Sequence, residues 1–207
     1  AGLAPPHLFL LQSPGGLMRI NLGARFPNQT LLSGPAAGVV SGVELARSSG
    51  RENIVTFDMG GTSTDVALYN GEYERAFETL VAGVRMRAPM MKIHTVAAGG
   101  GSILAFDGAR FRVGPESAGA NPGPACYRRG GPLCVTDANV LVGKIRPEFF
   151  PRVFGPTGDQ PLDAEIVREK FAALAQAVSR ASGEKRTAQE VADGFIRIAV
   201  ENMANAI

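Results

Sequence analysis

The first two thirds of the chain alternate short apolar runs with clusters of Gly, Pro, Asn and Asp, a pattern typical of strands joined by tight turns. Two of these turns carry strong hairpin signals, Asn70-Gly71 and Asp107-Gly108. A type I′ turn is predicted at Asn70-Gly71, because both residue types tolerate positive φ. Strands are predicted at 7–12, 53–57, 63–69, from about 72, at 102–106 and at 109–113.

The last third has helical periodicity instead. Apolar residues recur every three or four positions at Val167, Phe171, Leu174 and Val178, which predicts a helix packed on a core or on another subunit. Helices are predicted at 35–49 with Ser33 as N-cap, at about 136–142 capped by Thr136 or Asp137, after Asp163, and after the capping box Thr187–Glu190. One partial domain is therefore expected over 1–207, strand-rich over 1–135 and helical over 136–207.

Composition narrows the class of protein. The chain has 26 glycines and 14 prolines, which indicates many irregular loops, including a long one at 114–132. Its 21 basic and 19 acidic residues are dispersed, which argues against nucleic acid or a membrane as partner. Two cysteines in 207 residues favour a reducing compartment with both thiols free, and a cytoplasmic protein is predicted. The start at Ala1 and the end inside a helical pattern suggest a piece of a larger protein.

The segment Phe57–Val66 carries the most informative chemistry, FDMGGTSTDV. A carboxylate at the end of a buried strand, Asp58, can hold Mg²⁺ through water, and Asp65 returns close to it. Gly60 and Gly61 are expected to turn with positive φ and to bring backbone N–H groups against a phosphate. Hydroxyl donors follow at Thr62, Ser63 and Thr64. The alternative interpretation is an ordinary β-hairpin with a Gly-Gly turn, which would be as good an explanation for a D-x-G-G motif alone but is disfavoured by the full ten-residue segment.

This loop is neither a Walker A motif nor a Rossmann fingerprint. It resembles the phosphate loops of the actin, sugar kinase and Hsp70 superfamily. Five segments together resemble, in order, the hydantoinase A / 5-oxoprolinase family: SGPAAGVVSG at 33–42, FDMGGTSTDVAL at 57–68, HTVAAGGGSI at 94–103, RVGPESAGANPGPACY at 112–127 and VTDAN at 135–139.

The resemblance implies an α/β fold of the actin-like (ribonuclease H-like) ATPase type, with β-hairpins followed by C-terminal helices. It implies ATP and Mg²⁺ as cofactors, a cyclic amide such as hydantoin or 5-oxoproline as substrate, phosphorylation of its carbonyl oxygen, and a hydantoinase B-type partner. Asp58 and Asp65 would be catalytic, with Asp58 on the metal through water. The nucleotide phosphates would lie on Gly60, Gly61, Thr62, Ser63 and Thr64.

Members of the family carry a second D-x-G-G-T loop that is absent here, so the isolated fragment is expected to be inactive. Two other functions stay open at this point: the ATP-using subunit of an acetone-type carboxylase, and a non-catalytic nucleotide-binding module.

A second group of residues is a candidate for contact with substrate: His94, Gly99, Gly100, Gly101 and Ser102. Two interpretations of the three glycines fit the sequence equally well: they present backbone amides to a ligand, or they form a plain turn before a strand. For His94, a structural hydrogen bond is favoured over a ligand role. Cys126 is interpreted as a loop-packing residue, because the sequence places no activating group beside its thiol. Asp137 and Asn139 are interpreted as helix caps, which is the common role of both residue types at a helix start.

Overall fold

The computed structural model describes residues 8–81 and 83–207, which divide into two compact units. Unit 1 comprises 1–58 and 65–95, and unit 2 comprises 59–64 and 96–207. The tip of one hairpin, 59–64, therefore belongs to unit 2 while its two strands belong mainly to unit 1. The predicted division near 135 follows secondary-structure content and does not coincide with this boundary.

Unit 1 is built from short strands and one long helix. The hairpin of β1 (Phe9–Leu11) and β2 (Leu17–Arg19) leads into α1 (Ile20–Arg25), a 3₁₀ turn η2 (Pro27–Thr30) and α2 (Ser33–Ser48). The sheet that follows has the order β3 (Asn53–Met59), β4 (Thr64–Asn70), β9 (His94–Val96). Two small antiparallel pairs complete the unit, β5 (Arg75–Ala76) with β8 (Met90–Met91) and β6 (Thr79–Val81) with β7 (Val84–Met86).

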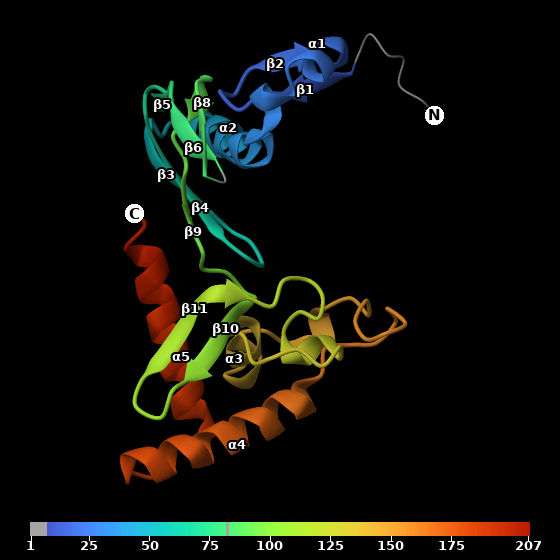
Figure 1. Cartoon of the computed structure of the whole chain (residues 1–207), viewed down its shortest axis with the longest axis vertical. Coiled ribbons are helices and arrows are strands. Elements are labelled where there is room, and N and C mark those ends of the chain that lie inside the picture. The colour runs from blue at the N-terminus through green and yellow to red at the C-terminus, as the bar shows by residue number, and fades with distance from the viewer. Residues whose placement is uncertain (1–7, 82) are drawn as a thin grey trace. The chain divides into compact units, whose positions relative to one another are not determined.

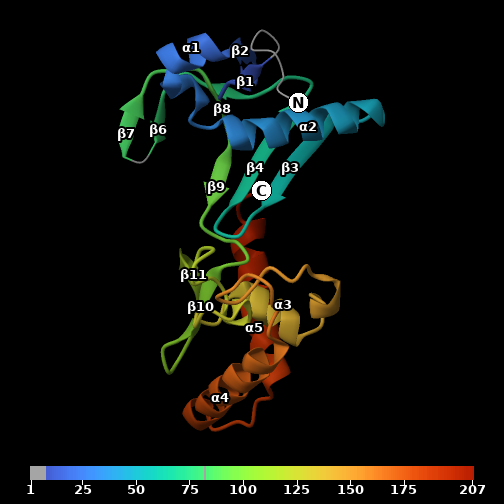
Figure 2. The same cartoon turned by 90° about the vertical axis from the view of Figure 1, so that its right-hand side faces the viewer.

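Helix α2 packs on one face of this sheet, as Figure 2 shows beside β3 and β4. Its buried residues Ala36, Val39 and Val43 form a core with Ala67 and Tyr69 of β4. The predicted N-cap is wrong: Ser33 is the first helical residue, Leu32 precedes it, and no side chain caps the end. Only the helix body, whose periodicity reflects burial, was predictable.

The turn after β4 also differs from the prediction. Gly71 has a φ of 90°, but Asn70 is outside the left-handed region, so the turn is not type I′. A single bridge joins Tyr69 to Tyr73, and the continuous strand expected from about 72 is absent from this described part of the chain. The short strand β5 pairs instead with β8, a partner distant in sequence.

Unit 2 packs a hairpin and two long helices around the larger core (Figure 1). The hairpin joins β10 (Ser102–Phe106) to β11 (Phe111–Ser117), and the helices are α3 (Val135–Leu141), α4 (Ala164–Ser182) and α5 (Ala188–Ala204), with 3₁₀ turns η3 (Ala125–Tyr127) and η4 (Pro147–Phe149). Phe171 of α4 and Phe195 of α5 are fully buried in this core. Both predicted caps of the long helices are confirmed: Asp163 begins α4, and the Thr187–Glu190 capping box begins α5.

Two details of unit 2 correct the sequence prediction. Helix α3 starts after Cys134, not after Thr136 or Asp137, and Asp137 is its third residue. The loop expected from 114 begins later, because β11 continues through Ser117. The α/β class with hairpins followed by C-terminal helices is confirmed, and both cysteines are free and buried.

Candidate functional site

Asp58 and Asp65 lie on the strands that flank the predicted phosphate loop. Asp58 is exposed near the end of β3, and Asp65 is half-buried near the start of β4. Both carboxylates line one groove of about 380 Å³ in unit 1, whose other wall is α2. The structure thus brings the two predicted carboxylates to one concave surface, which is the first requirement for handling a metal and a phosphate.

Two glycines of α2 let the helix approach these strands. A Cβ at Gly42 would lie 3.0 Å from the Cγ2 atom of Thr56, and one at Gly38 would lie 3.6 Å from Oδ2 of Asp58. The close approach leaves the Asp58 carboxylate beside the helix with no side chain between them. Sequence analysis missed this role, although two glycines four residues apart inside a helix are disfavoured by propensity and so signal a packing reason.

Asp65 is oriented by a residue that sequence analysis also missed. The Thr95 hydroxyl on β9 donates a hydrogen bond of 2.6 Å to Oδ1 of Asp65. This bond fixes one carboxylate oxygen and leaves the lone pairs of Oδ2 for another partner. The signal in the sequence was faint: Thr95 sits next to His94 in the segment HTVAAGGGSI.

The loop tip, described within unit 2, closes differently from the prediction. Neither Gly60 nor Gly61 has a positive φ; the turn closes through a 2.8 Å bond from the Gly60 N–H to the Ser63 carbonyl. The Thr64 hydroxyl is fully buried and donates to the Ala98 carbonyl at 2.6 Å, so it holds the loop rather than facing a ligand. Thr62 is exposed, and a Cβ at Gly61 would meet nothing within 4 Å, which leaves this part of the tip open to an anion.

The three-glycine turn is engaged by the chain itself. The Gly99 N–H donates to the hydroxyl of Ser102 at 2.9 Å, while the Gly100 and Gly101 N–H groups donate to the carbonyls of Gly60 and Gly61 at 3.1 and 2.6 Å. Amides that already have acceptors are poorly placed to bind a substrate. Of the two interpretations left open, the turn before a strand agrees better with this geometry.

His94 lies exposed on β9. Across the described ranges 8–81 and 83–207, no three His, Cys, Asp or Glu residues gather closely enough to hold a metal ion. A metal here would therefore need ligands from a substrate or from water in addition to the two aspartates.

Asp137 caps the start of α3 as the third helical residue of a capping box, and it also anchors the preceding loop. Its side chain is completely buried and accepts backbone N–H bonds from Ala125 at 3.0 Å, Cys126 at 2.8 Å and Cys134 at 2.8 Å. Burial raises the pKa of Asp137, and the three N–H donors offset part of that effect. Burial also raises the pKa of Cys126, and raises that of Cys134 to about 12, so neither thiol is activated as a nucleophile.

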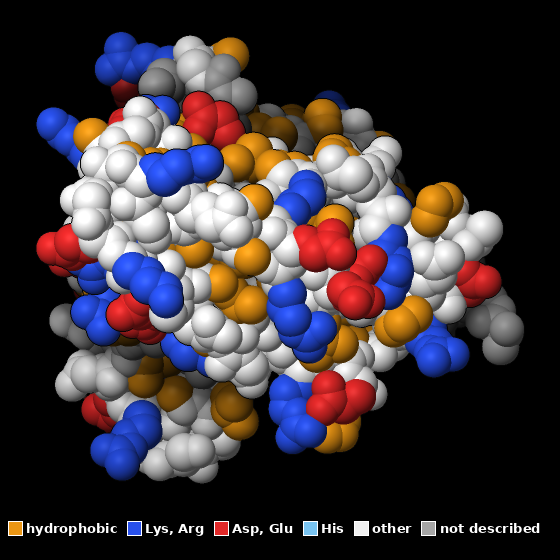
Figure 3. Space-filling view, turned by 90° about the horizontal axis from the view of Figure 1, so that it is seen from below, with side chains coloured by type: hydrophobic (Ala, Val, Ile, Leu, Met, Phe, Trp, Pro, Cys, Tyr) orange, Lys and Arg blue, Asp and Glu red, His pale blue; other side chains and the backbone are white. Residues whose placement is uncertain are grey.

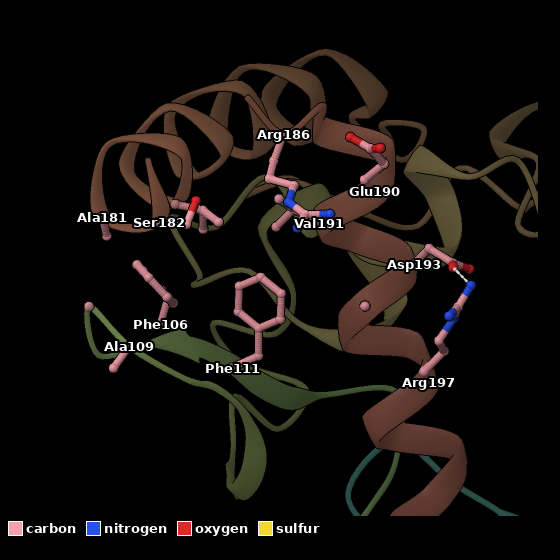
Figure 4. Close-up of a pocket in the computed structure, with 13 residues that line it drawn as sticks. Phe106, Ala109, Phe111, Ala181, Ser182, Arg186, Glu190, Val191, Asp193 and Arg197 are labelled. Carbon is pink, nitrogen blue, oxygen red and sulfur yellow. Dashed lines mark ion pairs between the residues drawn. The ribbon is translucent and has the colours of Figure 1, made fainter. Parts of the chain in front are cut away.

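A larger cavity of about 720 Å³ lies in unit 2, between the β10–β11 hairpin and the helices α4 and α5 (Figure 4). Phe106 and Phe111 form its apolar side. Its two arginines are neutralised within the chain, Arg197 by Asp193 at 2.9 Å and Arg186 by Glu184. None of the predicted site residues lines it, and the paired charges give it no evident ligand preference.

The surface shows no concentration of one charge on the face seen in Figure 3, where basic and acidic side chains are mixed. Over the ranges 8–81 and 83–207, every helix is too short or too polar to span a bilayer.

Known proteins with similar sequences and structures define the class. The nucleotide-free structure of acetone carboxylase, described as catalysing ATP-dependent acetone carboxylation, superimposes with a TM-score of 0.76 at 26% identity, over 94% of this chain and 26% of that one. The ATP-dependent caprolactamase from Pseudomonas jessenii gives a TM-score of 0.69 at 32% identity, over 86% of this chain and 25% of that one. Both neighbours are ATP-dependent enzymes, in agreement with the expected ATPase fold.

The sequence matches the hydantoinase/oxoprolinase family over residues 3–207. This chain belongs to that family. It is 47% identical over 205 residues to the 5-oxoprolinase of Saccharomyces cerevisiae, a match that covers 97% of this chain. The chain spans only 16% of the length of that relative.

Proposed function

We propose that this chain supplies one phosphate-handling half of an enzyme that uses ATP to open a cyclic amide. The observation that carries the proposal is the shared groove of Asp58 and Asp65, with Asp65 held by Thr95. Phosphoryl transfer needs mostly positioning and charge neutralisation, and two carboxylates that line one groove suit that task.

The donor set suits Mg²⁺ better than a metal that needs a closed cage. Mg²⁺ keeps several waters and is commonly bound by one or two carboxylates together with substrate phosphates. Asp58 would hold the ion, through water, and its exposure leaves room for that water. The ion would supply charge neutralisation at the transferred phosphate, while Gly61 and Thr62 at the open tip would contact the nucleotide.

In the proposed reaction, the amide carbonyl oxygen attacks the γ-phosphorus, and the bond from that phosphorus to the bridging oxygen breaks as ADP leaves. Water then adds to the activated carbonyl carbon, and the ring carbon–nitrogen bond breaks to leave a free amine and an acyl phosphate. A second water hydrolyses the acyl phosphate to a carboxylate and inorganic phosphate. Because the chain spans 16% of its yeast relative, further domains or a hydantoinase B-type subunit would complete the reaction. A lactam of the 5-oxoproline type is the first candidate substrate, because this chain is 47% identical to a 5-oxoprolinase.

The test uses the complete parent protein with its partner subunit. ADP release is measured with 5-oxoproline, with hydantoins, and with a ketone plus bicarbonate. We expect 5-oxoproline to stimulate ADP release, and Asp58→Asn to lower the stimulated rate by about 10²-fold or more, equivalent to ~2.7 kcal/mol of barrier. Asp193→Asn, in the paired cluster of the other cavity, is the control and should retain the rate. An unchanged rate in Asp58→Asn refutes the role of this carboxylate.

A carboxylase function is the second candidate, favoured by the TM-score of 0.76 with acetone carboxylase. Stimulation by ketone and bicarbonate alone would replace the lactam proposal. Nucleotide binding with no stimulation by any of these compounds would favour a non-catalytic binding module.

A further inference from the structure

The start of helix α3 is tied to the phosphate loop through the three-glycine turn, entirely within unit 2. The first link joins the turn to the loop tip. The Gly100 and Gly101 N–H groups donate to the Gly60 and Gly61 carbonyls, so two successive peptide groups of the tip are held by two successive peptide groups of the turn. The buried Thr64 hydroxyl adds a third bond from the tip, to the Ala98 carbonyl.

This contact is tight enough to exclude a side chain at Gly99 and at Gly101. A Cβ at Gly99 would lie 2.7 Å from the Gly60 carbonyl oxygen, and one at Gly101 would lie 2.8 Å from the Gly61 carbonyl oxygen. Backbone atoms at such distances cannot be relieved by rotating a side chain. The position of the tip is therefore set by the position of the turn.

The second link joins the turn to α3. The Thr136 N–H and the Thr136 hydroxyl both donate to the same Gly100 carbonyl, each at 2.8 Å. A Cβ at Gly100 would lie 2.7 Å from this hydroxyl oxygen, so the glycine is needed here for the threonine to reach the carbonyl. Next to Thr136, Asp137 fixes the same end of the helix through its three N–H bonds.

We infer that Thr136 is a positioning residue for the phosphate loop: it holds Gly100 and, through the turn, sets where Gly60 and Gly61 lie. This inference rests on the proposed function for its catalytic consequence. Displacement of a catalytic group by about 1 Å can cost about 10²-fold in rate, so a loop that positions phosphate needs such a support.

Thr136→Val is the sharpest perturbation, because it keeps the shape and removes the hydroxyl. The new methyl group cannot stay 2.8 Å from a carbonyl oxygen, since carbon–oxygen contacts lie at about 3.3–3.6 Å. The Gly100 carbonyl loses the hydroxyl bond and keeps only the backbone N–H bond, and the carbonyl or the new side chain must shift by a few tenths of an ångström or more. Thr136→Ser restores the hydroxyl and should rescue. Thr187→Ala is the control for general loss of stability, because it removes a helix cap in the same unit away from the turn.

Two readouts are taken on the complete parent protein with its partner. Amide hydrogen exchange over 59–64 and 97–101 reports the contact itself, and ADP release against ATP concentration separates kcat from KM. In Thr136→Val we expect faster exchange of the Gly100 and Gly101 amides and a kcat about tenfold lower, with Thr136→Ser and Thr187→Ala close to wild type.

The outcomes separate the two claims. Unchanged exchange in Thr136→Val overturns the positioning role, whatever the enzyme does. Faster exchange in Thr136→Val with an unchanged kcat shows that the contact made by Thr136 does not matter for the reaction. Faster exchange in Thr136→Val, combined with a wild type whose ADP release no lactam stimulates, refutes the proposed function, while the positioning contact stands.

Discussion

Removal of the Asp137 carboxylate is the most demanding test of how unit 2 is held together. In Asp137→Ala, the N–H groups of Ala125, Cys126 and Cys134 lose their acceptor at a site with no solvent exposure. Each unsatisfied buried donor costs about 1–3 kcal/mol. In the wild type, burial of the charge raises the pKa of Asp137 and offsets part of the stability that the three bonds contribute. We therefore expect Asp137→Ala to lower the free energy of unfolding by about 3–4 kcal/mol.

The loss is a large share of the roughly 5–15 kcal/mol that stabilises an ordinary domain. Asp137→Asn keeps one acceptor oxygen and turns an amide group toward a remaining N–H, so it should cost less, about 2 kcal/mol. The assay is urea unfolding followed by circular dichroism, which reports the long helices α4 and α5 of the same unit.

Asp163→Ala is the matched control, because Asp163 also caps a helix. It accepts two backbone N–H bonds, each of 3.1 Å, from Glu165 and Ile166, and its 20% exposed carboxylate also pairs with Arg128 at 2.7 Å. The expected cost is about 1–2 kcal/mol. If Asp137→Ala costs no more than Asp163→Ala, the three buried N–H bonds do not have the importance assigned to them.

Gly99→Ala should destabilise unit 2 and abolish lactam-stimulated ADP release in the parent protein, because its Cβ would lie 2.7 Å from the Gly60 carbonyl; Gly34→Ala, with nothing within 4 Å, should leave both unchanged. The raised thiol pKa values, about 12 for Cys134 and also raised for Cys126, predict that the contribution of the thiols to the unfolding free energy is constant below pH ~8.5 and falls as pH rises toward 12, because the unfolded thiols ionise first. When both cysteines are replaced by alanine, urea unfolding at pH 8 to 11 should show a shallower fall of the unfolding free energy with pH. A fall equal to that of the wild type would show that the buried thiols do not cause it.

Local signals in the sequence determined the elements whose formation depends on local chemistry. The caps at Asp163 and Thr187 and the apolar stripe of α4 predicted the two long helices, because a cap and a 3.6-residue period act within a few residues. The motif FDMGGTSTDV predicted Asp58 at the end of a buried strand and Asp65 on the returning strand. Asp65 does lie on β4, but β3 continues through Met59 and is mostly exposed, so Asp58 lies within an exposed strand. Their catalytic and metal roles stay predictions.

Only the tertiary structure decided what those residues contact. That β5 pairs with β8, that Thr95 holds Asp65, and that the Thr64 hydroxyl is buried all depend on partners distant in sequence, which no local pattern specifies. The three-glycine turn shows the limit most clearly. Its composition fits a ligand-binding loop and a packed turn equally well, and the choice is made by carbonyl oxygens about 40 residues away that approach too closely for any Cβ.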